Sequence, residues 1–112
     1  MSRDWPRRGE IRLVAVPDET KQRPCLILSA DWLNQYALDV TVVPITSVAR
    51  GNFPTRVPLP AGEGGLRVDS WAKCDQVTTV NKTRLVDSPF GRLSAQRMRE
   101  IADAVRIALD VG

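Results

Sequence analysis

Residues 39–47 read Asp-Val-Thr-Val-Val-Pro-Ile-Thr-Ser, and this stretch decides the fold class of the 112-residue chain. Most of its side chains are β-branched, and such side chains favour extended backbone. The stretch therefore predicts a β-strand. Because Pro44 lies within it and offers no N–H group to a neighbouring strand, we expect either an edge strand or a bulge at Pro44.

The segments before this stretch also predict short β structure. Residues 9–16 alternate, with apolar side chains on one face at Ile11, Leu13 and Ala15. Residues 24–29 form an apolar run of the length of a buried strand. Residues 30–36 then favour a helical turn, with Ser29 or Asp31 near its start.

The segments after it continue the same pattern. Residues 66–79 predict one long strand, whose alternation places on a single face Val68, Ser70, Ala72 and Cys74. Shorter extended segments are expected at residues 55–59 and 86–93, and Gly, Asn and Pro indicate a loop at 62–65 and a turn at 81–84.

One clear helix is predicted at the end of the chain. Ser94 is a good N-cap, and apolar residues recur at helical spacing at Met98, Ile101, Ala102, Val105, Ala108 and Leu109. We expect this face to pack against the sheet. Many short strands followed by a terminal helix predict a mainly β fold with a C-terminal helix, built as a small, curved, mainly antiparallel sheet or barrel.

Composition and charge limit the class of protein. Apolar residues make up 43% of the chain and charged residues 26%, as in ordinary globular proteins. We expect a flexible segment at 1–7 and a single domain over 8–112. No apolar run approaches the ~18 residues of a membrane span, and residues 1–8 lack the apolar core of a signal peptide. We therefore expect a cytoplasmic protein without a membrane partner. The net charge of +3 slightly favours anionic partners.

Cysteine and histidine contents restrict the chemistry. Cys25 and Cys74 are too few for a disulfide scaffold and lack the spacing of a zinc site, so we expect two buried thiols. The chain has no histidine, which removes the commonest metal ligand and the usual acid–base residue near neutral pH. We expect neither a metal nor a cofactor.

Four segments, taken in order, carry a family resemblance. They are RGEI at 8–11, RPCLILS at 23–29, VPITS at 43–47 and CDQVTT at 74–79. Their order and spacing resemble the MazF/PemK family of toxin endoribonucleases, over about the whole chain from residue 8 onward. The resemblance implies an SH3-like barrel of the CcdB/MazF toxin type, a homodimer, and sequence-specific, metal-independent cleavage of single-stranded RNA. It also implies a cognate antitoxin with an acidic, flexible tail.

The resemblance also assigns roles to residues. The family's catalytic arginine and threonine match Arg23 and Thr46. Positions near the RNA match Ser47, Lys73, Asp75, Gln76 and Thr78. Two features depart from the family: the loop at 17–22 is shorter than usual, and Lys73 stands where some members carry an arginine. Lysine lacks the bidentate fork of a guanidinium, so the cleavage specificity and the role of Lys73 stay open.

RNA chemistry explains why such residues suffice. The 2′-hydroxyl can attack the adjacent phosphorus and leave a 2′,3′-cyclic phosphate and a 5′-hydroxyl. Arg23 can hold two phosphoryl oxygens and give a proton, but it is a poor base because arginine stays protonated in proteins. Thr46 can donate a hydrogen bond to the same group. As candidate bases we name Asp75 and Glu19.

Two other functions remain possible from the sequence. One is a CcdB-like gyrase poison on the same fold, although the chain ends Leu109-Asp110-Val111-Gly112 without an aromatic residue. The other is a non-catalytic nucleic-acid-binding barrel, which would bind with steep salt dependence and release no product. Trp32 and Trp71 are expected in the core or in a dimer contact rather than stacked on bases.

Overall fold

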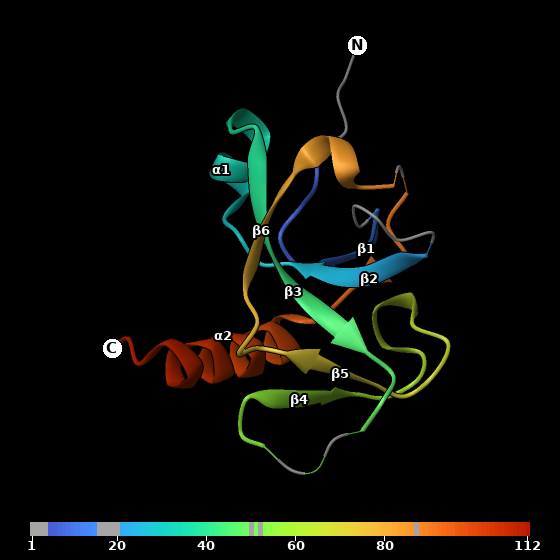
Figure 1. Cartoon of the computed structure of the whole chain (residues 1–112), viewed down its shortest axis with the longest axis vertical. Helices are drawn as coiled ribbons and strands as arrows, with labels where there is room; N and C mark the ends of the chain where they lie inside the picture. The colour runs from blue at the N-terminus through green and yellow to red at the C-terminus, as the bar shows by residue number, and fades with distance from the viewer. Residues whose placement is uncertain (1–4, 16–20, 50, 52, 87) are drawn as a thin grey trace.

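The computed structural model describes residues 5–15, 21–49, 51, 53–86 and 88–112. Figure 1 shows a curved sheet with a long C-terminal helix on one side. The strands are β1 (Glu10–Ala15), β2 (Gln22–Ile27), β3 (Asp39–Thr46), β4 (Arg56–Leu59), β5 (Ser70–Lys73), β6 (Thr78–Asn81) and β7 (Gly91–Arg92). The helices are α1 (Asp31–Tyr36) and α2 (Ala95–Leu109), with 3₁₀ turns η1 (Glu63–Gly65) and η2 (Lys82–Arg84). The predicted mainly β fold with a C-terminal helix is confirmed.

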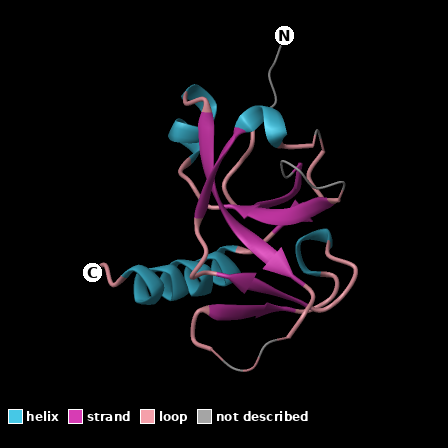
Figure 2. Cartoon of the chain, viewed as in Figure 1, coloured by secondary structure: helices cyan, strands magenta, loops and turns pink. Residues whose placement is uncertain are grey.

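The sheet is organised around β3. The strand order is β4-β5-β3-β2-β1-β7, with β6 also paired to β3, and every pairing is antiparallel. One edge of β3 pairs with β2, whereas its other edge pairs first with β6 and then with β5. Because β5 and β6 share one edge of β3, the sheet splits and curves around the end of this strand (Figure 2).

Pro44 led us to expect either an edge strand or a bulge. The edge-strand alternative is wrong, because β3 lies inside the sheet. On the edge facing β2, Pro44 pairs with Cys25. On the opposite edge, pairing with β6 ends at Val42 and pairing with β5 begins at Ile45. The proline therefore lies where this ladder is already interrupted, a place where a missing N–H donor is tolerated.

The predicted long strand over 66–79 is also wrong. Only β5 and β6 are extended, and the segment between them turns, with the N–H of Gln76 donating to the carbonyl of Lys73 at 2.9 Å. Of the predicted inward face, Ser70, Ala72 and Cys74 are buried, but Val68 is 56% exposed. Ile45 pairs with Ala72 and Val42 pairs with Thr78, so three positions along β3 correspond to six positions along the other segment. The extra residues must therefore turn out of the ladder between β5 and β6.

Both faces of the sheet are covered in part. The larger core lies between the sheet and α2, whose Ile101 and Ala104 are buried there. A smaller core on the other face contains Val14, Cys25, Ile27, Val40 and Val42. The prediction that alternate residues of the first strand form one apolar face is therefore only partly correct. Ile11 is buried, but Ala15 is exposed and Val14 faces the second core. A strand buried on both faces loses simple alternation.

The terminal helix begins as predicted. The Ser94 hydroxyl accepts the N–H of Arg97 at 3.1 Å and caps α2. The predicted apolar face is shorter than expected, because Leu109 is 51% exposed. Trp32, expected to be covered, is 68% exposed in this chain. Within the described residues, no helix is long and apolar enough to span a membrane.

The two cysteines are unpaired and buried, as expected. Burial raises the pKa of each thiol to about 12. Both therefore behave as small apolar residues of the core rather than as nucleophiles.

Candidate active site

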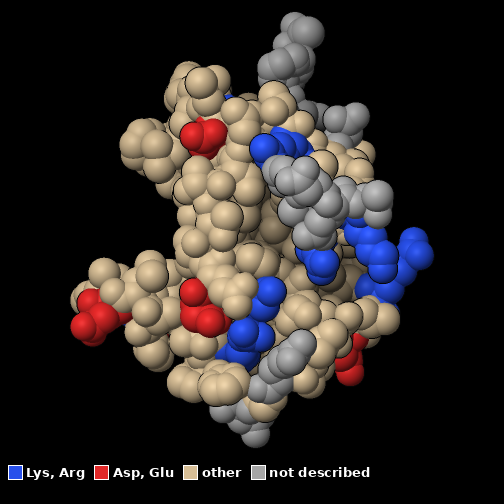
Figure 3. Space-filling view, viewed as in Figure 1, with Lys and Arg blue, Asp and Glu red and all other residues tan. Residues whose placement is uncertain are grey.

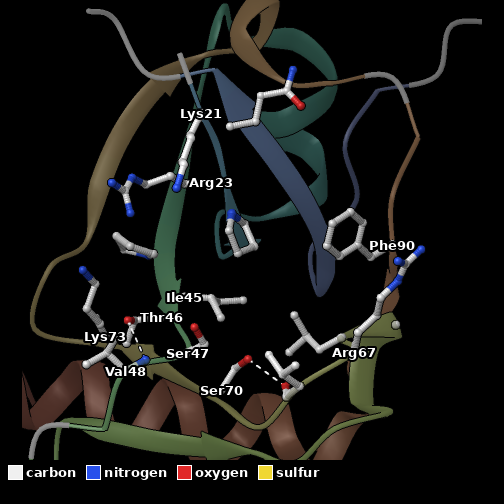
Figure 4. Close-up of a pocket in the computed structure, with 16 residues that line it drawn as sticks. Lys21, Arg23, Ile45, Thr46, Ser47, Val48, Arg67, Ser70, Lys73 and Phe90 are labelled. Atoms are coloured by element: carbon white, nitrogen blue, oxygen red, sulfur yellow. Dashed lines mark hydrogen bonds between the residues drawn. The ribbon is translucent and has the colours of Figure 1, made fainter. Parts of the chain in front are cut away.

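A pocket of about 700 Å³ opens where the start of β2 lies beside the end of β3. Arg23 is the second residue of β2, and Thr46 is the last residue of β3. Because the two strands are antiparallel, these ends meet at the same edge of the sheet. The pocket wall contains both residues, and it also contains Ser47 and Lys73 (Figure 4). The structure thus brings together four of the residues predicted from sequence.

The Thr46 side chain is held in a fixed orientation. It is half-buried, and its hydroxyl oxygen accepts the N–H of Val48 at 3.1 Å. This bond occupies a lone pair and not the hydroxyl hydrogen, so the hydroxyl can still donate to a ligand. Ser47 follows in the turn and is exposed. The end of β3 therefore presents two hydroxyl groups to the pocket.

The pocket wall is strongly basic. Among the described residues that line it, four are Lys or Arg and none is Asp or Glu; the four are Lys21, Arg23, Arg67 and Lys73. Figure 3 shows groups of Lys and Arg side chains around a hollow in this face of the molecule. A concave site lined by charges of one sign concentrates ligands of the opposite sign. An anion such as a phosphate diester suits this wall.

A second pocket of about 580 Å³ adjoins the first. Arg23 and Lys73 line both pockets and stand between them. The second pocket lies over the smaller core, with Val14, Val42 and Val80 in its wall. A chain-like ligand that passes Arg23 can therefore contact both pockets at once.

The remaining predicted residues are placed differently. Thr78 lines the second pocket, and its hydroxyl donates to the carbonyl of Gln76 at 2.9 Å. Gln76 lines neither pocket and is exposed. Asp75 also lines neither pocket, and its carboxylate lies 3.4 Å from the guanidinium of Arg56. Glu19 and most of the short loop at 17–22 lie outside the described residues.

The wall opposite Arg23 contains residues that sequence reasoning missed. Arg67 and Phe90 lie on that side of the pocket (Figure 4). They are brought together by a close approach of two backbone segments. A methyl group placed on Gly65 would lie 2.2 Å from the carbonyl oxygen of Phe90, and one on Gly91 would lie 2.6 Å from the backbone of Gly64. Neighbouring glycines in the sequence indicate that another backbone segment approaches closely, but they do not show which segment it is.

An ion pair fixes the same wall to α2. The Arg97 guanidinium donates to both carboxylate oxygens of Glu63, with its Nε at 2.8 Å, and to Glu100 at 2.6 Å. These hydrogen bonds from Arg97 lower the pKa of Glu63 below its ordinary value. Bidentate Arg–carboxylate pairs are strong and directional. η1 is therefore held both by backbone contact and by charge.

Within the described part of the chain, no three His, Cys, Asp or Glu side chains come together as a metal site.

Comparison with known proteins identifies relatives over nearly the whole chain. The sequence model of PemK-like, MazF-like toxins of type II toxin–antitoxin systems matches residues 7–109. The chain is 34% identical to Endoribonuclease MazF9 of Mycobacterium tuberculosis, covering 94% of this chain and 97% of that protein. It is 30% identical to Endoribonuclease EndoA of Bacillus subtilis, covering 78% and 75% respectively.

Solved structures agree with these relatives. The Mycobacterium tuberculosis toxin MazF-mt6 superposes with a TM-score of 0.80 at 32% identity, over 92% of this chain and 98% of that one. A mycobacterial endoribonuclease in complex with its cognate antitoxin gives a TM-score of 0.81 at 26% identity, over 96% and 97%.

Proposed function

The chain belongs to the PemK-like, MazF-like toxins of type II toxin–antitoxin systems, and we propose that it cuts single-stranded RNA, without a metal ion, at the pocket shared by Arg23 and Thr46. The observation that carries the proposal is this pair, set at two adjoining strand ends in a wall whose described residues include four cations and no carboxylate. Its relatives are named endoribonucleases. In a cell, such cutting of messenger RNA in the cytoplasm would arrest growth.

The proposed reaction uses the RNA's own nucleophile. The 2′-oxygen forms a bond to phosphorus, the bond from phosphorus to the 5′-oxygen breaks, and the products are a 2′,3′-cyclic phosphate and a 5′-hydroxyl. Arg23 holds the phosphoryl oxygens, whose negative charge grows in the transition state. It also gives the proton that the departing 5′-oxygen takes. Thr46 donates a hydrogen bond to the same phosphoryl group.

The mechanism is completed by a carboxylate that accepts the 2′-hydroxyl proton. Asp75 and Glu19 were the two candidates from sequence. Asp75 is engaged with Arg56 and lies outside the lining of both pockets, which favours a structural role at the turn between β5 and β6. We therefore keep Glu19, which precedes Arg23 by four positions in the sequence and lies outside the described residues, as the candidate base.

Two partners complete the proposal. We propose that an antitoxin with an acidic, flexible tail covers the basic pocket, whose four cations attract negative charge. A relative of similar fold has been solved with its cognate antitoxin. We also propose that the active form is a homodimer. Ser47, Lys73 and Thr78 would then contact RNA along the two pockets of each chain, while Gln76 would contact it only from outside them.

Purified protein, a defined RNA and EDTA test this function. We expect internal cuts in wild type, and intact RNA over the same time with Arg23→Gln that retains the wild-type melting temperature. Intact RNA with the wild type, together with stalled DNA gyrase, would instead support a gyrase poison. Salt-sensitive binding without products would support a binding barrel.

A further inference from the structure

Phe90 is an exposed aromatic residue in a basic pocket. Its side chain is 43% exposed, and Figure 4 shows its ring directed into the pocket that it lines. Neither core cluster includes it. A phenyl ring directed into a pocket can bury its apolar face against a ligand that has a flat, apolar face of its own. Single-stranded nucleic acids offer such faces in their unpaired bases.

The backbone beneath this ring is held firmly. The N–H of Phe90 donates to the carbonyl of Ile11 at 2.7 Å, and its carbonyl lies against Gly65. Glu63 in η1 is bound in turn by Arg97 of α2. A stacking platform is effective when it is fixed before the ligand arrives, because little conformational freedom is then lost on binding.

A cation accompanies the ring. Arg67 follows η1, is exposed, and extends along the same wall toward Phe90 (Figure 4). Both lie across the pocket from Thr46 and Lys73. An aromatic face beside a guanidinium matches one nucleotide, which carries a base to stack and a phosphate to bind.

We propose that Phe90 and Arg67 form a nucleotide subsite next to the scissile phosphate, in which Phe90 stacks on a base and Arg67 binds the adjoining phosphate. The inference rests on the proposed function, since it deepens the description of the same pocket. Phe90 then contributes to the choice of nucleotide beside the cut. Arg67 contributes affinity that does not depend on the base.

The test uses binding and cleavage separately. An RNA that carries 2′-deoxyribose at the cut site cannot be cleaved by 2′-hydroxyl attack, so its anisotropy reports affinity alone. Phe90→Leu removes the flat ring but keeps an apolar side chain. Base–aromatic stacking contributes enough that we expect affinity to fall about 5- to 150-fold. Phe90→Tyr keeps the ring and should retain affinity within about threefold.

The salt dependence separates the two residues. Loss of one phosphate contact on a single strand lowers the slope of log K against log salt by about 0.7. We expect this change in Arg67→Gln and no change of slope in Phe90→Leu. With cleavable RNAs that differ in one nucleotide beside the cut, Phe90→Leu should also reduce the discrimination between bases.

Phe53→Leu is the matched control, because Phe53 is a more exposed phenylalanine, at 55%, that lines neither pocket. It should bind and cleave as wild type. Equal affinity and equal base preference in wild type and Phe90→Leu, or an unchanged salt slope in Arg67→Gln, would overturn the subsite. If wild type cleaves no RNA at all, the proposed function fails, whereas cleavage that is indifferent to Phe90 and Arg67 overturns only this inference.

Discussion

At the scale of single residues, Arg23 and Thr46 contribute unequally to the proposed cleavage. Removing one preorganised donor from an anionic transition state typically costs about 10²–10³ in rate. We expect Arg23→Gln to lose at least that factor in kcat, because it removes both charge and proton donor. Thr46→Val should lose less, and Thr46→Ser should recover most of the rate. Single-turnover cleavage measures all three, and a Thr46→Val variant slower than Arg23→Gln would reverse the assignment.

Glu63 makes a residue-scale prediction about pH. Hydrogen bonds from Arg97 place the pKa of folded Glu63 below its ordinary value of 4.5. The ion pair therefore stabilises the fold fully above about pH 4.5, and this contribution is lost as the pH falls through the lowered value. Urea unfolding should show wild type more stable than Glu63→Gln at pH 6, by about 1 kcal/mol or less, and this difference should shrink as the pH is lowered below 4.5.

Asp103→Asn is the control for this measurement. Asp103 pairs with Arg106 on α2, the helix that also carries Arg97, but both side chains are mostly exposed, so the pair contributes little to stability. It should change the stability little over the same pH range. A difference between wild type and Glu63→Gln that stays constant as the pH is lowered below 4.5 would contradict the role of the ion pair.

At the scale of elements, two glycines test the backbone contact behind the pocket wall. Gly62 and Gly65 both have positive φ, at 98° and 81°, so alanine is strained at either position. Only at Gly65 would the added methyl also strike the Phe90 carbonyl, whereas nothing lies within 4 Å at Gly62. We expect Gly65→Ala to lower the free energy of unfolding by at least 1 kcal/mol more than Gly62→Ala. Equal losses in chemical denaturation would refute the contact.

The elements also show how far sequence reasoning reached. Local patterns suffice for α2, whose cap and apolar face lie within one segment, and for the β-branched strand that ends at Thr46. They do not suffice where a strand changes partner. Pro44 indicates a break in a ladder, but only the topology shows that β6 and β5 share one edge of β3.

The same limit applies to the site. The family resemblance named Arg23, Thr46, Ser47 and Lys73, and the fold places them in one pocket. Phe90 and Arg67 were missed because no local pattern relates them. Backbone packing between distant segments, together with the Glu63–Arg97 pair, brings them to the pocket.

At the scale of the whole molecule, the surface supports a prediction about assembly. Large apolar side chains are exposed on α1 and the segment after it, with Trp32 at 68%, Tyr36 at 79% and Leu38 at 79%. Contiguous exposed apolar surface marks interaction sites in folded proteins. We expect light scattering after size exclusion to give the mass of two chains. A single-chain mass at all micromolar concentrations would contradict the homodimer.

The central claim is that the RNA's own 2′-hydroxyl attacks phosphorus in the pocket of Arg23 and Thr46. The most direct measurement compares an all-ribose RNA with the same RNA bearing one 2′-deoxyribose at the cut site, both in EDTA. The account predicts a cyclic phosphate and a 5′-hydroxyl from the first RNA and no cut at that site in the second. Cleavage of the deoxy-substituted site, or a 5′-phosphate product, would contradict it.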